Sequence, residues 1–339
     1  MLMPEKIFLN NYCDGTYDVI PDSVFLNTMR DTVVPFLNER RHPVLIPRGN
    51  ELQLYCEYFL PAAATGKGTI FISHGFTESS DKFHEVIYYM LQEGYGVCIE
   101  DHRGHGRSRR PDETNVAGTA THVDHFQDYV DDVHYVVEHI IKKNLPGPYY
   151  LYAHSMGGAI AVTYLEQHPG FFEKAVLTAP MLEINRHGIP LHLAKLMTAL
   201  VCALGKGKDF FWGQKPFSPV ENFADSPGTC LERYLYYFHQ QLENPNYQSG
   251  GSSFRWALES VRADEILLRP SNCAKVTIPV LLFQADDDFF VNPGGQDQFI
   301  DQIPNGQLVF APGTKHEIYM SGADVLGKYW QAIFSFLSF

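Results

Sequence analysis

The sequence predicts an α/β fold, in which a mostly parallel sheet carries helices on both faces and a helical insertion interrupts the pattern. Three observations support this prediction. Up to residue 180, short apolar runs alternate with segments of helical periodicity. Such runs are typical of strands buried on both faces by crossover helices. Residues 181–270 then show little strand character, and the alternation resumes after them.

A hairpin is the first expected element, because two apolar-rich runs within 42–60 flank the turn signal Arg48-Gly49-Asn50. Buried strands of the parallel kind should follow it. We place them at 68–75, 95–101, 148–153 and 172–180. The segments between them have helical periodicity, with polar starts and glycine or basic ends. These helices are expected at 80–94, 122–144 and 156–168.

The remaining elements define the domain organisation. Strands are expected again at 278–288 and 306–313, and a closing helix at 321–339. We therefore assign 1–180, which includes an N-terminal extension, and 271–339 to one core. Residues 181–270 are expected to form a helical cap inserted after the sixth strand.

Composition narrows the possible partners. The chain has 339 residues, of which 45% are apolar, and its formal net charge is −13. This charge argues against a nucleic-acid partner, because phosphates repel an acidic surface. It also argues against tight electrostatic docking on anionic membranes.

Targeting signals are not evident in the sequence. The first residues lack a basic segment followed by an apolar one, and no run of about 18 uncharged apolar residues occurs. Six cysteines lie far apart without a C-x-x-C pair. We expect a cytoplasmic protein with free thiols and at most peripheral membrane contact. The sequence does not indicate an oligomeric state.

The stretch PYYLYAHSMGGAIAV at 148–162 places Ser155 at the junction of an expected strand and an expected helix. Small residues, Ala153 and Gly157, stand two positions to either side. A strand, a sharp turn and a helix with small-x-Ser-x-Gly at the turn form a nucleophile elbow, in which the serine hydroxyl is exposed. Glycine is usual where Ala153 stands, and we expect the extra methyl group to be tolerated.

The pattern also occurs a second time in the chain, and Ser155 has a simpler possible role. A second match, Ala-Asp-Ser-Pro-Gly at 224–228, fails because Pro227 has no N–H for an oxyanion hole and no strand precedes it. Taken alone, Ser155 could also be only a helix N-cap.

Serine needs a base and an orienting acid to act as a nucleophile, and after an elbow these follow in the order Asp or Glu, then His. Of 15 histidines, only His316 lies beyond residue 284, just after the last expected strand. The acid is expected after the preceding strand, where Asp286, Asp287 and Asp288 stand. We prefer Asp288 and keep Asp287 in reserve.

An oxyanion hole requires two backbone N–H groups aimed at the developing charge. Met156 follows the nucleophile candidate directly and supplies one donor. Gly75, the last residue of the strand expected at 68–75, lets the chain turn close to Ser155. We therefore predict the N–H of Phe76 as the second donor.

Taken together, five motifs resemble the α/β-hydrolase superfamily. More narrowly, the chain resembles the serine hydrolases that include bacterial lysophospholipases, monoacylglycerol lipases and serine aminopeptidase-like enzymes. The motifs are SHGF, DHRGHGRS, AHSMGG, LLFQADDDFFV and KHEIY, in that order. The segment NPNYQSGGSSFRWALES at 244–260 is similar to one in the bacterial lysophospholipase branch. The resemblance implies an α/β-hydrolase fold, a cap over an acyl pocket, Ser155 as nucleophile, Asp288 as acid and His316 as base.

An apolar face in the expected cap admits three interpretations. It could pack on the core, line the acyl pocket or touch lipid. Leu193, Met197 and Leu200 are our substrate-binding candidates on it. The whole face comprises Ile189, Leu193, Leu196, Met197, Leu200 and Leu204.

Two further patterns suggest ligands but have simpler explanations. His122, His125, Asp128 and Asp132 could share a helix face and hold a metal, yet a solvated face explains them as well. The glycines of DHRGHGRS resemble a phosphate-binding loop but lack its spacing, so we interpret this segment as a structural turn. No metal and no organic cofactor is expected.

These residues favour a serine hydrolase that cleaves carboxylic esters of single-chain lipids through an acyl-enzyme. The same machinery also serves carboxylesterases of small or aromatic esters and serine aminopeptidases. A ligand-binding protein without activity is a further alternative, which the three filled positions disfavour.

Overall fold

The computed structural model describes residues 6–49, 52–61, 66–108 and 119–338. Nine strands form one sheet in the order β1-β9-β8-β7-β6-β4-β5-β3-β2, in which β2 and β3 are antiparallel to their neighbours and the other pairs are parallel. The strands are β1 (Lys6–Phe8), β2 (Arg41–Pro47), β3 (Gln53–Phe59), β4 (Thr69–Ser73), β5 (Gly96–Glu100), β6 (Tyr149–His154), β7 (Lys174–Thr178), β8 (Val280–Asp287) and β9 (Gly306–Lys315).

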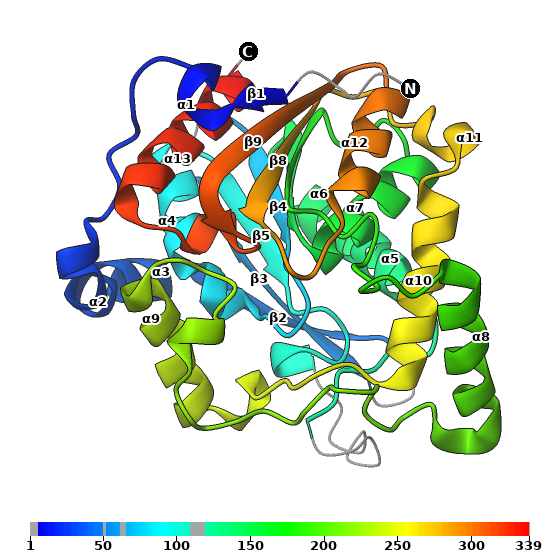
Figure 1. Ribbon diagram of the computed structural model, residues 1–339. Coiled ribbons are helices and arrows are strands. Elements are labelled where there is room, and N and C mark those ends of the chain that lie inside the picture. The colour runs from blue at the N-terminus through cyan, green and yellow to red at the C-terminus, as the bar shows by residue number, and fades with distance from the viewer. Residues whose placement is uncertain (1–5, 50–51, 62–65, 109–118, 339) are drawn as a thin grey trace.

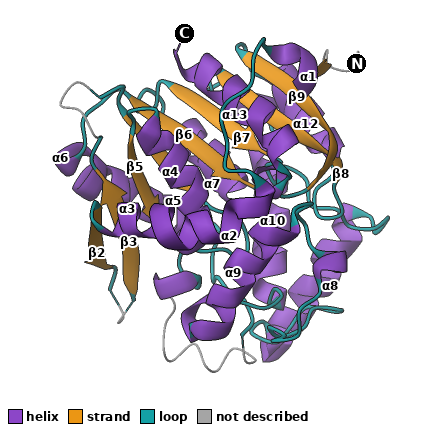
Figure 2. Ribbon diagram, turned by 90° about the vertical axis from the view of Figure 1, so that its left-hand side faces the viewer, coloured by secondary structure: helices purple, strands orange, loops and turns teal. Residues whose placement is uncertain are grey.

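Helices cover both faces of this sheet, as Figures 1 and 2 show. The α-helices before the insertion are α1 (Leu9–Tyr12), α2 (Phe25–Thr28), α3 (Val34–Asn38), α4 (His84–Gln92), α5 (Gln127–Val136), α6 (Lys142–Asn144) and α7 (Met156–Gln167). The later ones are α8 (Leu191–Val201), α9 (Leu231–Glu243), α10 (Phe254–Leu267), α11 (Pro270–Cys273), α12 (Pro293–Gln302) and α13 (Ala323–Ser338). Among the described residues, no helix combines the length and apolar character needed to cross a bilayer.

Alternation along the strands divides the core into two layers. On β4, Phe71 packs with α5, α7 and α12, whereas Ile70 and Ile72 pack with α4 and α13. On β8, Leu282 and Leu281 divide between the two layers in the same way. A strand buried on both faces must be apolar at every position, which is why these strands read as continuous apolar runs.

The expected elements are found, with several differences. The helix expected at 122–144 begins only at Gln127 and continues through the π-helical turn η6 (Val137–Ile141) into α6. Strand β1 and helices α1, α2, α3, α11 and α12 were not predicted. Because β1 adds a strand, the insertion follows the seventh strand of the chain. The proposed hairpin turn includes Asn50, which lies outside the described residues.

The insertion at 181–270 consists mainly of helices, including α8, α9 and α10. Two of its contacts with the core lie near the carboxyl ends of the parallel strands. The Trp256 ring packs at a tilt of 45° against the Phe76 ring, with centroids 4.3 Å apart, and the Tyr237 hydroxyl lies 3.1 Å from that of Ser79. The division into one core and one cap at these boundaries stays our interpretation.

Candidate active site

Ser155 occupies a strained bend between β6 and α7. Its backbone has φ 51° and ψ −119°, which non-glycine residues adopt at a cost of about 1–3 kcal/mol. The surrounding chain holds the bend: Ser155 donates its N–H to the Thr178 carbonyl (3.2 Å), and its carbonyl accepts from Met181 (2.8 Å). Neighbouring strand β7 therefore helps to keep the serine in this conformation.

Gly157 explains why this turn requires a small residue. A Cβ atom there would lie 2.1 Å from the carbonyl oxygen of Ser73, which is backbone and cannot swing away. On the other side, Ala153 is fully buried on β6, paired with Ser73 of β4. The elbow thus packs directly against the end of β4, where the loop with Phe76 begins.

His316 connects Ser155 to Asp288. Its Nε2 lies 2.8 Å from Ser155 Oγ, and its Nδ1 lies 2.7 Å from Asp288 Oδ2. Since a carboxylate can only accept, Nδ1–H donates to Asp288 and Nε2 is left to accept from the serine hydroxyl. The three residues follow β6, β8 and β9, whose carboxyl ends meet at one edge of the sheet.

Asp288 is the carboxylate that the fold directs to the histidine. Its Oδ1 accepts the N–H groups of Phe290 (2.9 Å) and Val291 (3.0 Å). Burial opposes ionisation, but the His316 hydrogen bond and charge and these two N–H groups outweigh it, so the pKa of Asp288 is lowered. Asp286 instead accepts from the N–H of Gly313 (2.9 Å), and Asp287 is exposed.

The two predicted oxyanion donors lie on either side of the elbow. Met156 is the first residue of α7, and the first N–H groups of a helix have no acceptor within it. In the loop after β4, the Gly75 N–H is occupied, since it donates to Glu78 Oε2 at 2.5 Å. Phe76 comes next and packs against Trp256. Their role as donors stays a prediction.

Comparison with known proteins adds the family. A family model described as "Serine aminopeptidase, S33" matches residues 64–321. The chain belongs to this S33 hydrolase family. It is 27% identical over 307 residues to a "Probable lysophospholipase L2" from Haemophilus influenzae, which covers 90% of this chain and 95% of that protein. It is 30% identical over 272 residues to "Lysophospholipase L2" from Escherichia coli K12, with 74% of each covered.

Solved structures show the same fold. A soluble variant of monoglyceride lipase from Saccharomyces cerevisiae superposes with a TM-score of 0.66 at 17% identity, over 88% of this chain and 95% of that one. Together with the sheet order and the elbow, this likeness establishes that the protein has the α/β-hydrolase fold.

A buried charged cluster that sequence reasoning missed lies behind the site of this S33 hydrolase. Lys82 Nζ is 3.0 Å from Glu78 Oε1 and also contacts Glu317, which is adjacent to His316 in sequence. Glu78 also accepts from the Tyr319 hydroxyl at 2.5 Å. The cluster therefore joins the Phe76 loop to the His316 loop. The sequence could have indicated this cluster, because its charged residues lie in or beside two of the motifs, SHGF and KHEIY.

Lys82 and Glu78 favour each other's charged form. Burial raises the pKa of Glu78, but Lys82 and neighbouring donors overcome that effect and the pKa is lowered. Burial likewise lowers the pKa of Lys82, and Glu317 and Glu78 reverse the effect, so the pKa is raised. Lys82 is thus held as a cation, whereas burial and the charge of Glu78 raise the pKa of Glu317 although Lys82 opposes this shift.

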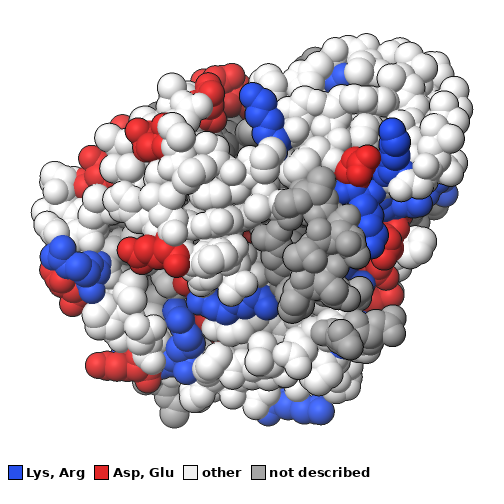
Figure 3. All heavy atoms as spheres, turned by 90° about the horizontal axis from the view of Figure 1, so that it is seen from below, with Lys and Arg blue, Asp and Glu red and all other residues white. Residues whose placement is uncertain are grey.

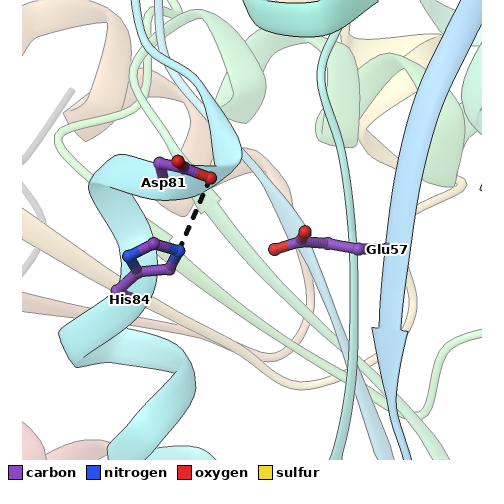
Figure 4. Close-up of side chains that lie close together, drawn as sticks. All are labelled: Glu57, Asp81 and His84. Atoms are coloured by element: carbon purple, nitrogen blue, oxygen red, sulfur yellow. Dashed lines mark ion pairs between the residues drawn. The ribbon is translucent and has the colours of Figure 1, made fainter. Parts of the chain in front are cut away.

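Two buried groups of side chains have the composition of metal ligands. Figure 4 shows the first, in which Glu57 points toward the Asp81–His84 pair. Guanidinium groups already neutralise it: Arg41 lies 3.2 Å from Glu57 and Arg107 lies 2.9 Å from Asp81. The second, Glu78, His154 and Glu317, surrounds Lys82. In both, side chains of the protein supply the positive charge.

The histidines and aspartates at 122–132, which the sequence analysis considered as possible metal ligands, contact other side chains of the protein. His122 Nδ1 lies 2.8 Å from Ser253 Oγ, and His125 precedes α5 and is exposed. Asp132 accepts from Arg103 at 2.6 Å and is buried, so a solvated face was the wrong explanation for it. These contacts link the segment to the insertion and to the loop after β5.

The segment DHRGHGRS is a turn held by its own aspartate. Asp101 accepts from the N–H groups of Ser80 (2.6 Å) and Arg107 (2.8 Å). Gly106 has φ 48°, and a Cβ atom there would lie 2.2 Å from Asp101 Oδ2. The glycine is needed for close packing against this carboxylate, as expected for a structural turn.

The cap candidates lie at the surface. Leu193, Met197 and Leu200 are 41%, 37% and 61% exposed on α8. Packing of this face on the core, one of the three interpretations, is therefore wrong. A role of these three side chains in binding substrate stays a prediction.

Proposed function

We propose that this S33 hydrolase cleaves carboxylic esters of single-chain lipids, with lysophospholipids as the first candidate substrate. The observation that carries the proposal is the hydrogen-bonded series Ser155–His316–Asp288 at the ends of three strands. Two relatives named lysophospholipase L2, matched over most of their length, support this substrate class.

The proposed reaction begins with the Ser155 hydroxyl. His316 Nε2 removes its proton as Oγ attacks the ester carbonyl, and Asp288 stabilises the imidazolium that forms. The N–H groups of Phe76 and Met156 are proposed to bind the oxyanion, and each such donor typically lowers the barrier by ~3 kcal/mol. His316 then gives the proton to the departing alcohol, and water releases the fatty acid by the same route.

Labelling with a fluorophosphonate tests the nucleophile. We expect one adduct per chain on Ser155, and none in Ser155→Ala. An active enzyme that stays unlabelled at Ser155 would contradict the mechanism. Ser79, a buried serine bonded to Tyr237, provides a control, since Ser79→Ala should still be labelled.

A substrate panel tests the class. We expect lysophosphatidylcholine and monoacylglycerol to be hydrolysed, and p-nitrophenyl esters to be turned over faster as the acyl chain lengthens from C2, because each buried methylene adds ~0.8 kcal/mol of binding. A sharp optimum at C2 would favour a carboxylesterase of small esters. Turnover of aminoacyl amides alone would favour the peptidase that the family description names.

Location belongs to the proposal as well. All six cysteines carry free thiols, which supports a reducing compartment such as the cytoplasm. We propose that the enzyme works there and meets the membrane only at its periphery.

A further inference from the structure

A second set of serine, histidine and acid side chains lies beneath the catalytic one. Ser73 Oγ is 3.1 Å from His102 Nε2, and His102 Nδ1 is 3.1 Å from Glu100 Oε1. Ser73 ends β4, Glu100 ends β5, and His102 lies in the turn after β5. None of the three is more than 1% exposed, so substrate cannot reach this serine. Any effect on catalysis must pass through the residues that they contact.

Glu100 is a carboxyl group in an unusual place. Charged side chains normally stay in water, and blue and red groups are scattered over the face drawn in Figure 3. Glu100 is completely buried, and its Oε2 has no hydrogen-bond partner among the described residues. In that part of the chain its one ion-pair partner is the ring of His102. An ionised carboxylate would be costly there, whereas a neutral carboxylic acid can donate one hydrogen bond.

The direction of each hydrogen bond follows from the number of protons. Ser73 Oγ also lies 3.1 Å from the Gly157 carbonyl, and a carbonyl can only accept, so the single hydroxyl proton points to Gly157. Nε2 of His102 must then carry the proton that Ser73 Oγ accepts. In a neutral imidazole Nδ1 is left without a proton, and it can bond to Glu100 only if the carboxyl group is the donor.

The alternative is an ionised Glu100 beside a charged His102, and burial disfavours both charges. Burial lowers the pKa of His102 to about 4, although Asp132 opposes the shift. Burial and the charge of Asp132 raise the pKa of Glu100 well above its usual range. Arg103 and Arg48 oppose this shift but do not reverse it. The neutral pair is therefore the state that these surroundings favour.

The serine branch of this network ends on the nucleophile elbow. Gly157 lies in the first turn of α7, next to Met156, whose N–H is one of the two proposed oxyanion donors. The Ser73 hydroxyl holds the Gly157 carbonyl, and the backbone of Ser73 is so close that a Cβ atom on Gly157 would be 2.1 Å from its oxygen. A shift of Ser73 would therefore move the turn that carries Ser155 and Met156.

The second branch ends on the other proposed donor. The backbone N–H of His102 donates to His74 Nε2 at 2.9 Å. Burial lowers the pKa of His74 to about 3, so its ring is neutral, and its proton is on Nδ1, which donates to the Gly75 carbonyl at 2.8 Å. This carbonyl and the Phe76 N–H belong to one peptide group. Because that group is planar, holding the carbonyl sets the direction of the N–H.

We propose that His102 is a positioning residue for both oxyanion donors, acting as a neutral imidazole that accepts a hydrogen bond from the protonated carboxyl group of Glu100. The order of protons is the reverse of the catalytic set, in which His316 donates to Asp288. The chain of donors therefore runs from Glu100 toward the elbow. The effect on rates rests on the proposed ester hydrolysis, whereas the protonation states do not depend on it.

Spectroscopy tests the protonation states without a substrate. The infrared difference spectrum of wild type minus Glu100→Gln at neutral pH should contain the C=O stretch of a protonated carboxyl group. Nitrogen NMR of protein with isotope-labelled histidine should show His102 as the neutral Nε2–H tautomer, identified by the loss of its signal in His102→Gln. A charged imidazole at His102, or a difference spectrum with carboxylate bands alone, would overturn the assignment.

Hydrolysis of p-nitrophenyl acetate tests the positioning. Glu100→Leu has no donor and should lower kcat about 100-fold, the effect of misplacing reacting groups by about 1 Å, with KM close to that of the parent. Glu100→Gln offers an amide N–H at the same place and should keep kcat close to that of the parent. Glu166→Leu is the matched control, because it removes another buried carboxyl with a raised pKa at the far end of α7. Its kcat should be unchanged.

A smaller change keeps the test valid if Glu100→Leu does not fold. Ser73→Ala removes the hydroxyl that holds Gly157 and should lower kcat about tenfold. Ser260→Ala, which removes a buried hydroxyl without a hydrogen-bond partner among the described residues, is its control. Parental kcat in folded Glu100→Leu or Ser73→Ala, or a Glu100→Gln enzyme as slow as Glu100→Leu, would overturn the positioning role. A wild-type protein inactive on every ester would refute the proposed function instead, and the spectra would still test the network.

Discussion

Replacing Lys82 by methionine tests how far the buried cluster positions the catalytic loops. The side chain of Lys82 is 8% exposed, and it is 3.0 Å from Glu78 and in contact with Glu317. At an effective dielectric constant of 20, one pair at this distance is worth about 5 kcal/mol. Methionine fills a similar volume but leaves two buried carboxylates without their cation.

The structure predicts two consequences of Lys82→Met. The free energy of unfolding should fall by about 3–5 kcal/mol, the usual cost of leaving a buried charge unpaired. Glu78 accepts from the Gly75 N–H, so its displacement should also move the Phe76 loop. Loss of one oxyanion donor would lower kcat about 100-fold and leave KM nearly constant.

Thermal unfolding and steady-state hydrolysis of a p-nitrophenyl ester measure both effects. Lys82→Arg, which retains the charge, should recover most of kcat, and this would separate positioning from a general loss of packing. Lys142→Met removes a solvent-exposed ion pair with Glu138 and should leave the free energy of unfolding close to that of the parent. A Lys82→Met enzyme with wild-type kcat and stability would refute the reasoning.

Three other substitutions probe the acid, the elbow and a buried carboxyl. Asp288→Asn should lower kcat by about 10⁴, because His316 loses the acceptor for Nδ1–H, whereas Asp287→Asn should stay within twofold in the same ester assay. Gly157→Ala should unfold at a much lower temperature because its Cβ would meet the Ser73 carbonyl, while Gly170→Ala, with open space around it and φ 87°, should cost only about 1–2 kcal/mol. Burial raises the pKa of Glu166 to about 8 despite the opposing charge of Lys275. The folded state therefore retains this proton above the unfolded pKa of 4.5, and stability falls by up to about 1.4 kcal/mol per unit as the pH rises from 4.5 to 8. Glu166→Gln should match the parent near pH 4.5 and have a higher Tm at pH 8.5; equal Tm values at pH 8.5 would show that Glu166 is ionised without cost.

Local sequence patterns were sufficient to predict most of the sheet and most of the candidate site. A strand buried on both faces must be apolar throughout, so β4 to β9 were visible as apolar runs. The elbow was visible because its turn tolerates only small residues around Ser155. The order of Ser155, Asp288 and His316 then followed from which strand ends carry suitable side chains. Strand β1, at three residues, was too short to produce a pattern.

Tertiary structure decided which neighbours these residues have. Nothing local distinguishes Asp288 from Asp287 until two backbone N–H groups and His316 converge on Asp288 alone. The cluster of Glu78, Lys82 and Glu317 joins positions more than 200 residues apart, so no sequence window contains it. Helical periodicity shows only that one face of α8 is apolar, because an amphipathic face has the same pattern whether protein, substrate or a membrane covers it.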